Sequence, residues 1–267
     1  MIGNCITAVL TVGFFGFTTA VVDAQELWLR PDKYFYEPGE QAVIEIQRGE
    51  EFIGSPLPLE KTDIRLLENW NAHGSQNLLA GYERNEKAVF TSKLNNEGYQ
   101  FIFLKTTQPY SVEAESFNEY LKQYGHDRYY EDRERKGNLD KDVRIALTHN
   151  IQLTLRSGTA NAKGWNKPRK LPVEVIPDKN PQTLRRGDRI HFTVLENGEP
   201  AFGVRVKIWN RWDNRTTIQN IYTEKDGTVS TTISNPGDWM VTVVKLSTSS
   251  GENDYVGDVF CLLFGYR

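Results

Sequence analysis

The stretch LPVEVIPDKNPQTLRRGDRIHFTVLENGEP, residues 171–200, decides the fold class. It contains two short apolar segments, 171–177 and 189–195, and residues that favour turns follow each of them. The pair Asn197-Gly198 is a strong short-range hairpin signal, because both residue types accept the positive φ of a type I′ turn. The stretch therefore predicts antiparallel strands that are joined by tight turns.

The same pattern continues to the end of the chain. The turn pairs Asp226-Gly227 and Pro236-Gly237 separate further segments in which apolar and polar residues alternate. Six or seven short strands in roughly 95 residues are typical of an immunoglobulin-like or prealbumin-like sandwich. We therefore place a C-terminal β-sandwich domain at 171–267. Its remaining strands are expected at 204–209, 219–223, 228–233, 239–246 and 256–264.

The region before residue 171 is also rich in strand patterns. Turn clusters such as Glu37-Pro38-Gly39-Glu40 separate short alternating segments, at a spacing that is typical of an antiparallel sandwich. We therefore predict an N-terminal β domain at 25–170. Its strands are expected at 42–48, 63–67, 87–91, 99–105 and 142–156.

One segment, about 112–138, departs from the strand pattern. Apolar residues fall at i, i+3, i+4 and i+7, which places them on one face of a helix, and Gly125 follows as the expected helix end. The fold expected from the sequence is therefore mainly β, with two antiparallel β-sandwich domains and a short helical insertion. The four apolar positions are Phe117, Tyr120, Leu121 and Tyr124.

The N-terminal segment predicts export. Residues 6–22 carry no charged side chain, and Val22 and Ala24 occupy the two positions that a signal peptidase reads. We therefore expect a signal peptide at 1–24, with Gln25 as the first mature residue, and a periplasmic or cell-envelope location. The alternative is an uncleaved membrane anchor, because no Lys or Arg precedes Ile6 and the apolar run is close to the ~20 residues that span a bilayer.

Composition excludes several classes of function. The net charge of −3 and the pI of about 5.9 come without a basic stripe, so we expect no nucleic-acid partner. Membrane contact is expected only through an uncleaved N-terminal segment. Cleavage would leave Cys261 as the one cysteine, which excludes an intramolecular disulfide in the mature chain and indicates a small buried residue.

No catalytic motif is present, and we predict that the protein is not an enzyme. The sequence has no G-x-S-x-G, H-E-x-x-H, phosphate-binding glycine loop or C-x-x-C. None of the four histidines pairs with another at i+2 or i+4, as a local metal motif would require. His126, after the predicted helix, and His149, within a predicted strand, are the candidate metal ligands.

Aromatic residues near polar loops are the other candidates for binding. Trp165, Trp209 and Trp212, with Trp70, lie in or near such loops. Aromatic platforms bind sugars, whereas a Trp near a strand end is also a common core or rim residue. We select Trp165, Trp209 and Trp212 as candidate binding residues.

Several motifs spread along the chain occur in an order and at spacings that resemble one known family. They begin with 26–31 (ELWLRP) and 36–40 (YEPGE), and they continue with 177–181, 184–188, 197–200, 226–227 and 236–239. This set of motifs resembles the DUF4198 family over nearly the whole mature chain. The resemblance implies an exported β protein and, for some members, a component of nickel or cobalt uptake. It implies a nickel or cobalt ion as the cofactor and a membrane transporter or another envelope protein as the partner.

One position departs from the family pattern. Members commonly carry His just before the acidic residue and the Trp-Leu pair, where its imidazole and the new α-amine could together hold a metal ion. This chain has Gln25 there. Our first hypothesis is an exported, non-catalytic binding or accessory protein of a nickel or cobalt uptake system. The alternative is a structural or adhesive cell-envelope module that binds a protein or a glycan.

Overall fold

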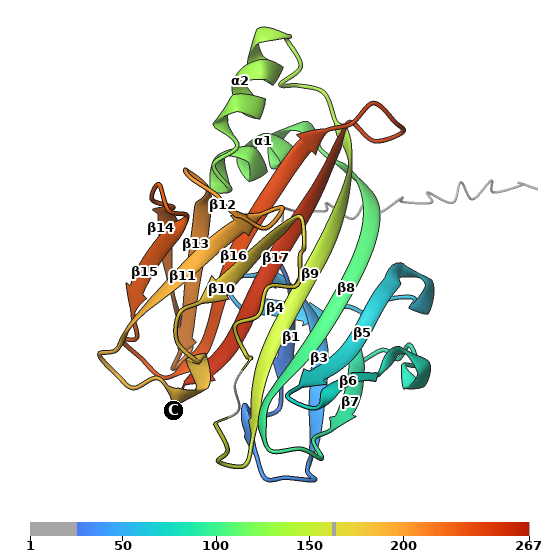
Figure 1. The fold of residues 1–267 in the computed structure, drawn as a ribbon. Coiled ribbons are helices and arrows are strands. Elements are labelled where there is room, and N and C mark those ends of the chain that lie inside the picture. Colours follow the sequence, from blue (N-terminus) through green and yellow to red (C-terminus); the bar gives the residue numbers. More distant parts are fainter. Residues whose placement is uncertain (1–25, 162–163, 267) are drawn as a thin grey trace, which may run out of the picture.

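A computed structural model describes residues 26–161 and 164–266, and Figure 1 shows their fold. The predicted signal peptide, 1–24, and Gln25 lie outside the described residues. Strands dominate the fold, in one nine-stranded and two four-stranded sheets. This confirms the prediction of a mainly β, sandwich-like protein.

The nine-stranded sheet, called the long sheet below, contains strands from both halves of the sequence. Most of its strand pairs are antiparallel, but β17 runs parallel to β9, with Tyr255 opposite Ile145 and Phe264 opposite Thr154. The order is β14 (Arg215–Tyr222), β13 (Arg205–Trp212), β16 (Gly237–Thr248), β17 (Tyr255–Tyr266), β9 (Val143–Ser157), β8 (Gly98–Val112), β5 (Ile64–Asn71) and β6 (Gly74–Asn77), and β2 (Phe35–Tyr36) pairs with β9.

The parallel β9–β17 ladder joins the two predicted domains. Strand periodicity does not predict it, because a strand pairs in either direction with the same alternation of side chains. The predicted boundary between residues 170 and 171 lies in the segment from β9 to β10. Whether the two halves fold separately stays a prediction.

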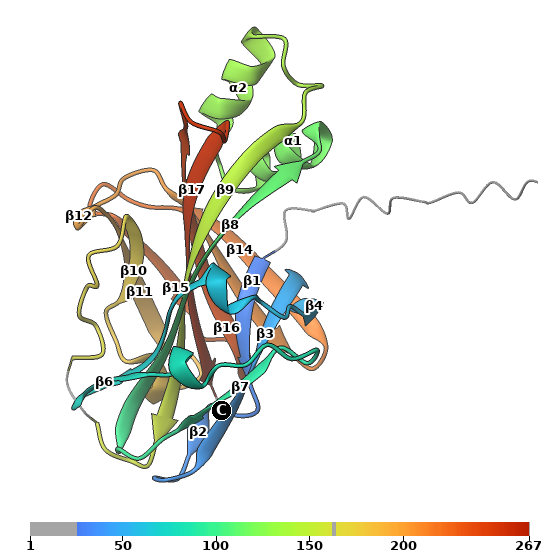
Figure 2. The same ribbon diagram turned by 90° about the vertical axis from the view of Figure 1, so that its right-hand side faces the viewer.

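A smaller sheet covers each face of the long sheet. Figure 2 shows the long sheet nearly edge-on, with β10 and β11 on one side and β1 and β3 on the other. The first small sheet contains β1 (Glu26–Pro31), β3 (Gln41–Glu50), β4 (Ile53–Pro56) and β7 (Val89–Lys93). The second contains β10 (Val173–Pro177), β11 (Arg189–Glu196), β12 (Glu199–Pro200) and β15 (Thr228–Thr232).

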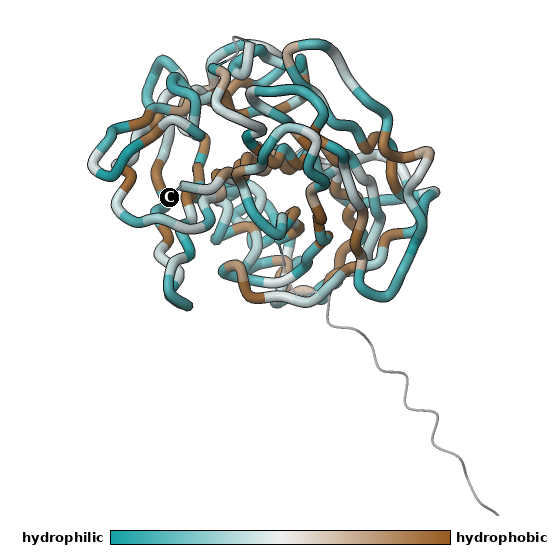
Figure 3. The backbone as a smooth tube through the Cα atoms, turned by 90° about the horizontal axis from the view of Figure 1, so that it is seen from below, coloured by the Kyte–Doolittle hydropathy of each residue, from teal (hydrophilic) through white to brown (hydrophobic). Residues whose placement is uncertain are grey.

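Both faces of the central strands of the long sheet are therefore buried, in two separate cores. On β8, Ile102 and Leu104 belong to the core beneath β1 and β3, whereas Phe103 belongs to the core beneath β10 and β11. Successive residues of a strand point to opposite faces, which explains why β8 and β17 contain long runs of buried residues. Figure 3, seen from below, shows the apolar residues gathered on the central strands and hydrophilic residues in the peripheral loops.

The predicted turns and helices agree with the structure. Asn197 and Gly198 connect β11 to β12 with φ of 52° and 89°, as a type I′ turn requires. Two helices lie within the predicted segment 112–138 and extend past the end of the long sheet (Figure 1). They are α1 (Ala114–Gln123) and α2 (Asp127–Arg135), and the short 3₁₀ helices are η1 (Lys61–Asp63), η2 (Leu79–Gly81) and η3 (Pro181–Thr183).

The end of α1 is a Schellman motif centred on Gly125. Gly125 N donates to Lys122 O (3.3 Å), and His126 N donates to Leu121 O (2.7 Å). The φ of Gly125 is +71°, which glycine adopts without the steric cost that a Cβ would add. In the described part of the chain, no helix has the length and apolar character needed to cross a membrane.

Candidate functional site

A groove with a volume of about 570 Å³ lies over one part of the long sheet. Figure 1 shows that β10 and β11 do not extend over β5 and β8. The floor of the groove is formed by side chains of β5 and β8, and its roof by the segment 164–171, which leads into β10. The volume lies within the range of small-molecule binding sites, roughly 300–1,000 Å³. The lining residues are Leu66, Trp70, Asn71, Ala72, Gly74, Tyr99, Phe101, Phe103, Gly164, Lys167, Pro168, Arg169, Lys170 and Leu171.

Strand alternation makes the floor aromatic. Tyr99, Phe101 and Phe103 occupy every second position of β8 and therefore point to the same face of the sheet. Trp70 of β5 lies opposite Phe101 in the ladder, which brings the indole ring into the same row. The rings of Tyr99 and Phe101 stack with centroids 4.7 Å apart. Trp70 is 39% exposed, so it offers ring surface to a ligand.

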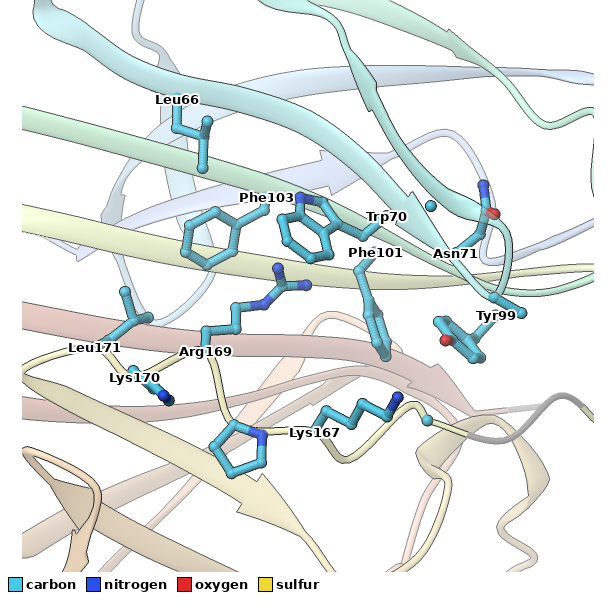
Figure 4. Close-up of a pocket in the computed structure, with 14 residues that line it drawn as sticks. Leu66, Trp70, Asn71, Tyr99, Phe101, Phe103, Lys167, Arg169, Lys170 and Leu171 are labelled. Carbon is cyan, nitrogen blue, oxygen red and sulfur yellow. The ribbon is translucent and has the colours of Figure 1, made fainter.

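Arg169 lies over this aromatic floor (Figure 4). Its guanidinium carbon is 4.5 Å from the ring centroid of Trp70 and 4.7 Å from that of Phe103, which are cation–π distances. Arg169 Nε donates to Gln152 Oε1 of β9 (3.1 Å), whereas its two terminal nitrogens donate to no described residue. Burial lowers the pKa of the guanidinium to about 10, so it keeps its charge at neutral pH.

A buried carboxylate holds the roof in place. Glu174 of β10 is 1% exposed and accepts hydrogen bonds from Arg169 N (2.7 Å) and Lys170 N (3.1 Å). Lys170 has a φ of 60°, so the chain turns sharply at this point. The main-chain anchor thus aims the Arg169 side chain at the floor.

The rim adds polar groups around the exposed indole. Trp70 Nε1 donates to Glu68 Oε2 (2.5 Å), which fixes the orientation of the ring. Lys167 and Asn71 lie at the edge of the groove, and Figure 4 shows the Lys167 ammonium directed toward Phe101 and Tyr99. The groove therefore combines flat apolar surface with three cationic side chains, Lys167, Arg169 and Lys170, an arrangement that suits a ring-bearing anion.

Comparison with known proteins identifies the family. The model of the family described as "Domain of unknown function (DUF4198)" matches residues 22–245. The chain belongs to this family. The resemblance inferred from the sequence motifs is thereby confirmed, although the family description assigns no function. Among curated proteins, none matches the chain.

Solved structures add only distant similarities for this DUF4198 protein. One is Escherichia coli alpha-2-macroglobulin activated by porcine elastase, with 12% identity over 90% of this chain, a TM-score of 0.25, and a match to 20% of that chain. Another is the structure of the Clostridium thermocellum CbhA fibronectin(III)-like modules, with 8% identity and a TM-score of 0.21. That match covers 88% of this chain and 93% of the other chain. TM-scores this low support no argument about fold or function. This chain thus spans about a fifth of the macroglobulin chain.

The two candidate metal ligands of the DUF4198 protein occupy different settings. His149 is buried within β9, and burial lowers its pKa to about 4. His126 follows α1 with its Nε2 unpartnered, and burial likewise lowers its pKa to about 4. Neutral imidazole is the form that binds metals. However, residues 26–161 and 164–266 contain no group of three or more His, Cys, Asp or Glu side chains that could hold a metal ion.

The three candidate tryptophans are not brought together. Trp209 is buried on β13, and Trp212 is 49% exposed at the end of the same strand. Trp165 lies half-buried in the roof segment of the groove but does not line it. Trp70 does line it, although the sequence marked this residue only as one tryptophan near a loop.

Sequence reasoning missed Arg169 and the aromatic row on β8. The row had a visible signal, because aromatic residues at 99, 101 and 103 must share one face of a strand. Arg169 had none. It lies in an aperiodic segment, and only the three-dimensional fold places it over β5 and β8.

Proposed function

We propose that this DUF4198 protein is an exported, non-catalytic binding protein that holds an acidic sugar in the groove. One observation carries this proposal. The guanidinium of Arg169 has two terminal nitrogens that donate to no described residue, and it stacks over the ring of Trp70, which stays 39% exposed.

The cationic side chains favour an acidic ligand. The guanidinium fork matches a carboxylate, and such charge-assisted bonds are about twice as strong as neutral ones. Lys167 at the rim adds a second positive charge. A uronic acid offers the carboxylate that both groups require.

The aromatic side chains favour a sugar ring. The face of an indole is electron-rich, whereas the C–H groups on one face of a pyranose are weakly positive, so the two surfaces attract. Trp70 is 39% exposed, so part of its ring remains open to a sugar next to the stacked guanidinium of Arg169, and its N–H is already bound to Glu68. Carboxylate recognition and ring stacking can therefore act on one sugar unit.

The composition of the groove supports binding rather than catalysis. Its described lining residues include no Ser, Thr, Cys, His, Asp or Glu, the side chains that most often supply nucleophiles and general bases. An exported location, in the periplasm or at the cell envelope, rests on the apolar segment 6–22.

A part in nickel or cobalt uptake, with a membrane transporter or another envelope protein as partner, stays a prediction from the family resemblance. His126 and His149 remain its candidate ligands. Calorimetry of the metal-stripped protein with Ni²⁺ and Co²⁺ tests it, and sub-micromolar binding is the outcome that this prediction requires.

Calorimetry with a galacturonic acid trisaccharide and with the neutral galactose trisaccharide tests the sugar proposal. We expect the acidic sugar to bind at least tenfold more tightly than the neutral one. Trp70→Ala and Arg169→Met should each weaken binding at least tenfold, and Arg169→Lys should recover only part of the loss because it lacks the fork.

Trp212→Ala is the matched control. Trp212 is exposed on β13, which is five positions from β5 in the strand order of the long sheet, or roughly 24 Å at about 4.8 Å per strand. Its removal should leave sugar binding unchanged. Equal affinity for the acidic and neutral sugars, or wild-type binding by Trp70→Ala, would refute the proposal.

A further inference from the structure

A second, smaller pocket lies on the opposite face of the long sheet. It has a volume of about 220 Å³ and lies between β13, β14, the end of α1 and the turn that joins β3 to β4. It shares no lining residue with the groove. Nearly all of its lining side chains are polar: Glu26, Glu50, Glu51, Gln123, Arg205, Lys207, Trp209, Ile218 and Asn220.

Strand β13 forms one wall of this pocket. Arg205, Lys207 and Trp209 occupy every second position and therefore project from the same face. Glu26, at the start of β1, faces them, with its Oε1 3.5 Å from Lys207 Nζ. The pocket thus brings Glu26, at the first described strand, next to a strand from the C-terminal half of the chain.

The lysine in this wall already has its partners. Lys207 Nζ is 4.2 Å from the ring centroid of Tyr124 and 4.9 Å from that of Trp209, and it donates to Gln123 Oε1 (3.4 Å). Tyr124 Oη donates to Glu26 Oε1 (2.7 Å). These contacts leave the other oxygen of the Glu26 carboxylate unused.

Three buried polar atoms of the wall have no hydrogen-bond partner among the described residues: Glu26 Oε2, Trp209 Nε1 and Arg205 Nε. Glu26 is 6% exposed and Trp209 is 3% exposed, so bulk water has little access to form hydrogen bonds with either group. Buried polar groups in folded proteins are nearly always paired, and unpaired ones call for a missing partner. Here one acceptor and two donors line the same pocket.

We propose that this pocket binds a free, small α-amino acid. The ligand ammonium would donate to Glu26 Oε2, and the ligand carboxylate would accept from Trp209 Nε1 and Arg205. A ligand that carries an ammonium and a carboxylate on one carbon atom satisfies both kinds of unpaired group at once. The proposal is independent of sugar binding in the groove.

The remaining walls fit this class of ligand. Glu50 and Glu51 add negative charge that favours an ammonium group, and Ile218 offers an apolar surface to a short side chain. The volume of about 220 Å³ lies below the range of roughly 300–1,000 Å³ that is usual for sites of drug-sized ligands, which favours a small ligand.

Calorimetry of the mature chain with each of the twenty common L-α-amino acids tests the proposal. We expect at least one of the smaller ones to bind. Its N-acetyl derivative, which lacks the ammonium, and its methyl ester, which lacks the carboxylate, should each bind at least thirtyfold more weakly. No binding of any of the twenty, or binding of both blocked derivatives as tight as that of the free amino acid, would overturn the proposal.

Two variants locate the site without disturbing the fold. Trp209→Phe keeps an aromatic ring and removes only the unpaired N–H, and it should weaken binding at least fivefold. Asn220→Phe fills the pocket from an exposed strand position and should abolish binding. Trp212→Phe, on the same strand, and Trp70→Ala, in the groove, should bind the amino acid as the wild type does. Wild-type affinity in Asn220→Phe would place the ligand elsewhere.

Discussion

Glu26 and Lys207 form an ion pair inside the protein, with Oε1 and Nζ 3.5 Å apart and side chains that are 3% and 7% exposed. Burial raises the pKa of the carboxyl, and the nearby ammonium opposes that effect. Burial lowers the pKa of the ammonium, and the carboxylate opposes it. Each charge therefore depends on the other to remain in the interior.

Removing one member of this pair should lower the free energy of unfolding more than removing both members. Lys207→Met leaves a buried carboxylate without its counter-charge, and we expect a loss of about 3–5 kcal/mol in the free energy of unfolding. Glu26→Gln combined with Lys207→Met should recover most of that loss. Urea unfolding of the two single variants and the double variant measures the coupling. Purely additive losses would show that the two charges act independently.

Acid should destabilise the protein through the buried His149. The folded pKa of His149 is about 4, below the ordinary 6.5, because burial opposes the charged imidazolium. The neutral side chain therefore contributes to the free energy of unfolding fully above pH 6.5, and this contribution is lost as the pH falls through about 4. The difference between the two pKa values corresponds to about 3 kcal/mol. Urea unfolding between pH 7 and pH 4 should show this slope. His149→Leu should flatten it, and an unchanged slope would contradict the assignment.

Gly125 should tolerate alanine poorly. Its φ of +71° is unfavourable for alanine, and an added Cβ would lie 2.9 Å from Arg205 Cβ. Gly137 is a matched control, because its φ is +63° and nothing lies within 4 Å of an added Cβ. We expect Gly137→Ala to lose about 1–2 kcal/mol of unfolding free energy, and Gly125→Ala to lose more. Equal losses would show that the contact with Arg205 relaxes without cost.

Cys261 should be unreactive in the folded protein. It is 1% exposed, and burial raises the pKa of its thiol to about 12, so almost no thiolate forms at neutral pH. Ellman's reagent should react only after unfolding. The number of thiols then also reports processing, because cleavage after Ala24 removes Cys5 and leaves one thiol of two. Two thiols in protein purified from the envelope would contradict cleavage.

Local sequence signals predicted the local structure well. Asn197-Gly198 specified a hairpin, and the spacing from Phe117 to Tyr124 specified a helix, because in both cases the cause lies within a few residues. Gly125 ended that helix for the same reason.

Contacts between distant segments were the part that sequence patterns left open. Nothing in the alternation of β9 or β17 specifies that they pair, or in which direction. Trp209 shows the same limit. Its neighbours suggested a polar loop, but β1 and α1 cover that face of β13 and bury the ring. The groove likewise depends on residue 169 meeting residue 70, a contact that no local pattern encodes.

The parallel ladder between β9 and β17 also sets the order in which the chain can acquire its shape. β17 is the last strand of the described chain, yet it lies between β16 and β9 near the middle of the long sheet. During synthesis, β9 therefore remains without this partner until residues 110 positions later have emerged, since Ile145 pairs with Tyr255. Such non-local pairing slows folding, and the strand edges stay unpaired until it is complete. A ribosome-bound chain that ends before residue 255 should thus still expose the edge of β9, where a chaperone can bind.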